Sequence, residues 1–154
     1  MGNPTRPITE GNLLMAMRAP IEMLGLDHLV IRCVDLGTMQ RFYCDLIGCE
    51  LVRHNENFDL YHLRAGAQLI DLIAVDGFLG KRGGAAPGAE GKNLDHFAIR
   101  IADFDEVALH AWVSENDLEI VEEGERFGAD GAGPSIYLRD PEGNIIELKG
   151  PPDT

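Results

Sequence analysis

The order of apolar and polar positions predicts a first βαβββ unit in the first half of the chain. Residues 28–33 are rich in Val, Leu and Ile, which is typical of a buried strand. Residues 37–46 then show the i, i+3, i+4, i+7, i+8 spacing of one buried helical stripe. This stripe consists of Met39, Phe42, Tyr43, Leu46 and Ile47. Three extended stretches follow at 50–54, 58–64 and 68–75, the last two joined by a short Gly-containing hairpin loop.

The second half repeats this order. We expect a strand near 96–101, a helix over about 105–116 capped by Asp103, and strands near 119–122, 135–139 and 144–149. The turn sequence DPEGN joins the last two strands, and its Glu142 is expected to contribute to neither metal binding nor activity. The first strands read LDHLVIRCVDL and LDHFAIRIADF, which are identical at six of eleven positions. This self-similarity indicates a duplication.

The predicted fold class is α+β, with two tandem βαβββ modules that form a cupped mixed sheet and carry their helices on the outer face. The first module covers residues 25–79 and the second covers 93–151. Residues 80–92, GKRGGAAPGAEGK, are rich in Gly and Ala, which indicates a linker or a long mobile loop. Residues 1–24 lie outside both modules and are expected to contain a short helix.

Strand periodicity places polar residues on the concave face of each module. In the last hairpin, one parity is apolar and can pack under the helix, while Tyr137, Arg139 and Glu147 fall on the opposite parity together with Ser135. Aligning QLIDLIA with NIIELKG sets Asp71 against Glu147. His62 and Arg64 then share the face of Asp71, again with alternate apolar residues on the other side.

Each module therefore has a His at the start of its first strand and a carboxylate in its last strand. If a pseudo-twofold relates the modules, His28, Asp71, His96 and Glu147 can converge on one point and form a divalent-metal site. Ordered imidazoles need partners, which nearby backbone or the Asp before each His could supply. Taken singly, such a His is more often structural and Glu147 more often a solvated edge residue. The repetition, and the cost of an unpaired carboxylate in the apolar strand around Asp71, favour the metal site.

Composition narrows the classes of function. The chain carries 26 acidic and 13 basic residues, a net charge of −13, which disfavours binding to nucleic acid. We expect no membrane association, because no apolar run approaches the roughly 18 residues that a span requires. Three cysteines without a CxxC pair indicate neither a disulfide framework nor a thiolate zinc site, and they suit the cytoplasm.

Four segments resemble the vicinal oxygen chelate superfamily, which includes glyoxalase I, fosfomycin-resistance and bleomycin-binding proteins, methylmalonyl-CoA epimerases and extradiol dioxygenases. These segments are LDHLVIRCVDL, MQRFYCDLIGCELV, NLDHFAIRIADF and SIYLRDPEGNIIELKGP. The resemblance spans residues 25–151 as one such domain. It implies paired βαβββ modules and one divalent ion per site, which could be Zn, Ni, Mn, Co or Fe(II). The implied ligands are His28, His96 and Glu147, with Asp71 at the fourth position.

The resemblance also sets the expected function. We expect a homodimeric, glyoxalase-like lyase or isomerase that acts on a small substrate chelating the metal through neighbouring oxygens. Glu147 would act as ligand and base, with Tyr137 and His62 as further catalytic residues and Arg139 and Arg64 as substrate-binding residues. Glyoxalase-like members usually carry Glu where this chain has Asp71, which leaves direct or water-bridged contact open. The alternatives are an extradiol-type Fe(II) dioxygenase and a drug-binding resistance protein of the same fold.

Overall fold

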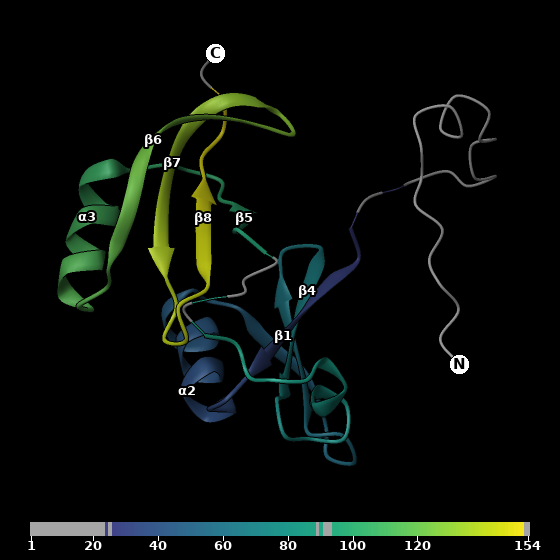
Figure 1. The fold of residues 1–154 in the computed structure, drawn as a ribbon. Helices are drawn as coiled ribbons and strands as arrows, with labels where there is room; N and C mark the ends of the chain where they lie inside the picture. Colours follow the sequence, from purple (N-terminus) through teal and green to yellow (C-terminus); the bar gives the residue numbers. More distant parts are fainter. Residues whose placement is uncertain (1–23, 25, 89, 91–93, 153–154) are drawn as a thin grey trace, which may run out of the picture.

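The computed structural model describes residues 24, 26–88, 90 and 94–152, and within them it contains two modules with the same order of elements (Figure 1). The elements of the first module are β1 (His28–Cys33), α2 (Leu36–Arg41), the π-helical turn η1 (Phe42–Leu46), β2 (Glu50–Asn55), β3 (Leu60–Ala65) and β4 (Gln68–Ala74). The elements of the second are β5 (Phe97–Arg100), α3 (Glu106–Glu115), β6 (Ile120–Gly128), β7 (Gly131–Arg139) and β8 (Ile145–Lys149).

Each module forms a four-stranded mixed sheet. The strand orders are β1-β4-β3-β2 and β5-β8-β7-β6. In both sheets the first strand runs parallel to the last strand, and the other pairings are antiparallel. The two sheets therefore have the same topology, and the α+β class with tandem βαβββ modules is confirmed.

The apolar parity of the strands packs against the helices, as the sequence pattern predicts. The four apolar residues of the last hairpin, Ile136, Leu138, Ile146 and Leu148, are all buried. They belong to one hydrophobic cluster that also contains Met39, Phe42 and Tyr43 of the first helical stripe. The core is continuous between the modules, since the rings of Tyr43 and Phe97 stack with centroids 6.5 Å apart.

Aspartate caps begin both α-helices. The Asp35 carboxylate accepts from the backbone N–H of Thr38 at 2.9 Å, which satisfies one of the free donors in the first turn of α2. The corresponding cap of α3 is Asp105, which accepts from the backbone N–H of Ala108 at 3.0 Å. The expectation that Asp103 caps this helix is wrong, because a cap must immediately precede the first helical residue and α3 begins at Glu106.

The hairpin of β6 and β7 is longer than the sequence pattern predicts. Its pairing continues from Ile120↔Leu138 out to Gly128↔Gly131. Four glycines and Pro134 interrupt the side-chain alternation along this stretch, and such residues usually argue against strand. The extra length is important for the site, because the hairpin tip lies over one end of β8.

The DPEGN turn joins the second module to the first and is here called the inter-module clasp, formed by Asp140 and Glu142. The Glu142 carboxylate accepts from the backbone N–H groups of Val34 and Asp35 at 2.9 and 2.6 Å. The buried Tyr43 hydroxyl donates to Asp140 Oδ2 at 2.9 Å. Figure 1 shows α2 beside this turn. Glu142 is thus a structural contact between modules rather than a free turn residue.

The segment after β4 contains the 3-10 turn η2 (Gly80–Gly83), and Arg32 binds it. The Arg32 guanidinium donates to the backbone carbonyls of Gly80, Gly83, Gly84 and Ala85. Part of the predicted linker is therefore fixed to β1. The helix expected within residues 1–24 falls, apart from Leu24, on positions outside the described residues. Among the described helices, none is long and apolar enough to span a membrane.

Candidate metal centre

The first candidate ligand pair lies on β1 and β4. His28 begins β1, and its Nδ1 is 2.6 Å from the Asp27 carboxylate, so its Nε2 is directed away from this hydrogen bond. The bond to Asp27 raises the pKa of His28 above 6.5, and the negative charge of Asp71 contributes to the rise. The side chain is 46% exposed, so the imidazole is oriented yet accessible.

Asp71 lies in the middle of β4 and is only 4% exposed. It is paired in register with Val30 on one side and His62 on the other. His62 Nδ1 and Asp71 Oδ1 are 2.8 Å apart, so His62 compensates the burial of this carboxylate. The sequence-predicted residues His62 and Asp71 are thus brought into contact, and a direct ligand role for Asp71 remains a prediction.

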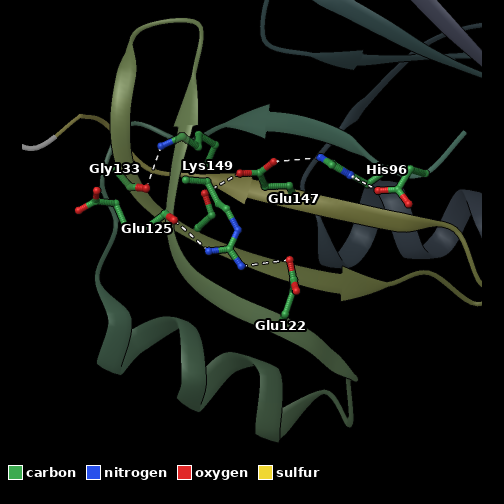
Figure 2. Close-up of polar contacts among 9 residues, drawn as sticks. His96, Glu122, Glu125, Gly133, Glu147 and Lys149 are labelled. Atoms are coloured by element: carbon green, nitrogen blue, oxygen red, sulfur yellow. Dashed lines mark hydrogen bonds and ion pairs between the residues drawn. The ribbon is translucent and has the colours of Figure 1, made fainter.

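The second candidate pair is formed by His96 and Glu147 (Figure 2). His96 immediately precedes β5, and its Nδ1 lies 2.7 Å from the Asp95 carboxylate. Its Nε2 lies 3.4 Å from Glu147 Oε2 on β8. The pair repeats the arrangement of the first module, in which the Asp before the His orients the imidazole. Such carboxylate–histidine contacts are the usual support of a metal-ligating imidazole.

Glu147 is a buried carboxylate with its two oxygens in different environments. It is 5% exposed, and Ser135 Oγ donates to its Oε1 at 2.6 Å. The other oxygen faces His96. Sequence parity placed Ser135 on this face, but its hydrogen bond to Glu147 was not predicted. The sequence signal for this bond was that the Ser135 hydroxyl lies on the neighbouring strand and on the same face as Glu147.

Tyr137 stands opposite Glu147 in register and lies edge-on to His96, with ring centroids 5.2 Å apart. Burial and the charge of Glu147 raise the pKa of Tyr137, so its phenol stays protonated near neutral pH and can donate a hydrogen bond. Arg126 is a further residue of this site that the sequence pattern did not indicate: its guanidinium lies 5.6 Å from the Tyr137 ring and 3.1 Å from the Glu122 carboxylate. Arg126 comes from the part of β6 that the pattern did not predict.

The two predicted substrate-binding arginines are engaged with neighbours. Arg139 Nε binds the Glu119 carboxylate at 2.8 Å, and Arg64 Nη1 donates weakly to the Ala67 carbonyl at 3.4 Å. Their registers, Arg139↔Ile145 and Arg64↔Leu69, place them at corresponding positions of the two modules. Their substrate roles remain predictions.

The four predicted ligands do not meet within one chain. Among the described residues there is no group of three or more His, Cys, Asp or Glu side chains that could hold a metal ion. The expectation that all four converge on one point is therefore not met inside a single chain, where they stay as two pairs on two sheets. Each pair by itself still fits a divalent ion, because it offers an oriented imidazole and a buried carboxylate, which are nitrogen and oxygen donors.

The family of the chain follows from sequence. Residues 25–148 match the model of the Glyoxalase/Bleomycin resistance protein/Dioxygenase superfamily. The protein belongs to this superfamily, and the resemblance described from its strand motifs is confirmed. A curated relative, virulence protein STM3117 of Salmonella typhimurium strain LT2, is 34% identical over 125 residues, which cover 80% of this chain and 81% of the relative.

Solved structures agree with this assignment. The crystal structure of STM3117 superposes with a TM-score of 0.64 at 28% identity, covering 85% of this chain and 99% of that chain. An integron cassette protein from the mobile metagenome of V. cholerae gives a TM-score of 0.64 at 27% identity over 84% of this chain and 97% of that chain. Lactoylglutathione lyase from Agrobacterium tumefaciens, at 19% identity, has a TM-score of 0.58 with coverages of 83% and 94%, which shows a shared fold.

Proposed function

We propose that this protein is a divalent-metal-dependent, glyoxalase-like enzyme of the lyase or isomerase type. Its substrate would be a small molecule that presents two neighbouring oxygens to the metal. The observation that carries the proposal is the repeated pair: an imidazole held by the preceding Asp, and a buried carboxylate in the last strand of the same module. A solvated surface His has no need of such a partner, and a buried carboxylate requires compensation.

We further propose that the metal centre is completed between two copies of the chain. His28 and Asp71 of one protomer would face His96 and Glu147 of the other. In a twofold-symmetric dimer this exchange gives two equivalent sites. The support is that each module carries half of a ligand set, while no described group within one chain reaches three ligands.

The side chains around Glu147 define the chemistry available to the substrate. When bound, a divalent ion would supply Lewis-acid polarisation of the two substrate oxygens. Ser135 holds Oε1 of Glu147, which leaves Oε2 as the atom able to accept a substrate proton. The Tyr137 phenol, which is protonated and lies beside His96, can donate to a developing negative charge on substrate oxygen.

Metal titration tests the proposal. Protein freed of metal by chelator and titrated calorimetrically with Ni, Zn, Mn, Co or Fe(II) is expected to bind one ion per chain. His96→Ala and Glu147→Gln are each expected to lose at least about 100-fold in affinity, because each removes a direct ligand. Asp71→Ala should lose at least about 10-fold, the lower bound for a group acting through water.

His110→Ala is the matched control. His110 is an exposed imidazole that also pairs with a carboxylate, Glu123, at 2.8 Å, but it lies on α3 away from both ligand pairs. Its replacement should leave metal affinity unchanged. Sub-stoichiometric binding of every ion by the wild-type protein, or equal losses in His110→Ala and His96→Ala, would contradict the proposed function.

A further inference from the structure

A hollow on the second sheet lies beside Glu147 and contains no other predicted metal ligand. Its walls include Ala98, Arg100, Phe127, Gly128, Glu147 and Lys149. Its volume is about 270 Å³, just below the range of roughly 300–1,000 Å³ that accommodates drug-sized ligands. The hollow is therefore suited to a small molecule or to one end of a larger one.

Lys149 is the unusual residue in this hollow. It follows Glu147 by two positions on β8, which puts both side chains on the same face of the strand. It is 6% exposed, and its Nζ donates to the Gly133 carbonyl at 2.9 Å (Figure 2). Among the described residues, the Gly133 carbonyl is the one hydrogen-bond partner of the Lys149 ammonium. No carboxylate of these residues forms an ion pair with Lys149.

A buried ammonium with one neutral acceptor is incompletely compensated. An ammonium has three N–H donors, and removing its charge from water without a counter-charge is energetically costly. No side chain can cover Lys149 at Gly128 or Gly133: a Cβ at Gly128 would stand 3.0 Å from Lys149 Cε, and one at Gly133 would stand 3.1 Å from its Nζ. The two glycines thus let the hairpin backbone pack closely against Lys149, and the hollow lies on the remaining side of this residue.

Arg100 adds a second cation next to Lys149. The two residues are direct partners in the parallel β5–β8 register. Like charges at directly opposed positions destabilise a sheet. Arg100 is neutralised by an ion pair with Asp130 from the hairpin tip, whereas Lys149 is not. An anion bound in the hollow would supply the counter-charge that Lys149 lacks.

The fold itself does not require a lysine at this position. In the first module the corresponding register partners are Arg32 and Ile73. Ile73 is buried, and Arg32 binds the carbonyls of the η2 segment. The same topology therefore forms with an apolar residue in place of Lys149, and the pair of adjacent cations exists in the second module only.

We infer that the hollow at Lys149 and Arg100 binds an anionic oxygen group of the substrate, either a carboxylate or a phosphate. This inference rests on the proposed function, because it places the chelating oxygens at Glu147. Two residues of strand separate Lys149 from Glu147, a distance of about 6.6 Å. The substrate is then a short molecule with neighbouring oxygens at one end and an anionic group at the other. Since the chain carries a net charge of −13, the ammonium of Lys149, which has no carboxylate partner, is what admits an anion here.

Binding of simple anions to metal-free protein tests the inference. Succinate and inorganic phosphate serve as probes, one for each chemistry, in calorimetric titration at fixed ionic strength. The wild-type protein is expected to bind at least one of them, and Lys149→Met is expected to weaken that binding at least 10-fold, while Lys149→Arg retains most of it. Lys81→Met, which removes an exposed cation on η2, is the control and should bind like wild type.

Lysine NMR provides a second measurement that needs no variant to fold. The chain has three lysines, so ¹³Cε labelling gives few signals. Addition of the probe should shift the Lys149 signal and leave the Lys81 signal in place. An unmoved Lys149 signal, or equal probe affinity in wild type and Lys149→Met, would overturn the inference.

The two proposals can fail separately. Metal binding without Lys149-dependent anion binding would remove the anion subsite and leave the metal enzyme in place. Lys149-dependent anion binding in a protein that binds no metal would support the subsite and remove the proposed function.

Discussion

His28 and His96 each have a neighbouring Asp that fixes the ring by its Nδ1. The distances are 2.6 and 2.7 Å, so the preceding Asp holds each ring in the same way. The sequence suggests these aspartates as partners because they directly precede each His. It could not establish that His62 would take Asp71 as its partner, since this contact depends on the β3–β4 register.

We predict that Asp27→Asn lowers the pKa of His28. The hydrogen bond to ionised Asp27 favours the protonated imidazole and holds this pKa above 6.5. A proton and a metal compete for the imidazole, so the metal affinity of wild type should fall as the pH drops through this raised pKa. In Asp27→Asn the metal affinity should begin to fall only at a lower pH than in wild type.

NMR titration of the metal-free protein measures the effect directly. The pKa of His28 should decrease in Asp27→Asn. The loss of ring orientation should also weaken metal binding at pH 8 by about 10–100-fold. A His28 pKa that Asp27→Asn leaves unaltered would show that the hydrogen bond does not control the ring.

At the scale of elements, the sequence predicted most of the fold because its hydrophobic period is clear. β1 and β4 were predicted within one residue of their ends, and the stripe that contains Tyr43 marked the first helix. The second helix was placed correctly but its cap was not, because two Asp residues lie near its start. The β6–β7 hairpin was predicted too short, since glycines carry no side-chain period. Arg126 was therefore missed.

The inter-module clasp gives a prediction at this scale. Glu142→Gln replaces a carboxylate that accepts two backbone N–H groups with an amide that has one acceptor oxygen. It should lower the free energy of unfolding by roughly 1–2 kcal/mol. Tyr43→Phe should lower it by about 1 kcal/mol by removing the buried bond to Asp140.

Urea unfolding followed by circular dichroism measures both changes. Glu56→Gln is a suitable control, because Glu56 is an exposed carboxylate in another turn, between β2 and β3. Glu56→Gln should leave the free energy of unfolding nearly unchanged. If Glu142→Gln were as stable as Glu56→Gln, the clasp would not contribute to the junction between the modules.

At the scale of the whole molecule, the two modules share one core but keep their ligand pairs apart. The duplication could be read from two similar strand sequences. The way in which the duplicated modules face each other could not be predicted from the sequence. Their relative placement depends on contacts such as the one between Glu142 and the start of α2, and no local sequence pattern encodes such contacts. We therefore propose that each metal centre would combine the first module of one chain with the second module of another.

Mixing two variants that are each defective in metal binding tests whether two chains share a site. His28→Ala damages only the first-module half of a site, and Glu147→Gln damages only the second-module half. After unfolding and refolding together, a mixed dimer contains one site with both defects and one intact site. Random assortment should restore tight metal binding at about a quarter of all sites, whereas each variant refolded alone should show none. If the mixture binds no more metal than the separate variants, the site does not span two chains and the proposed shared metal centre is wrong.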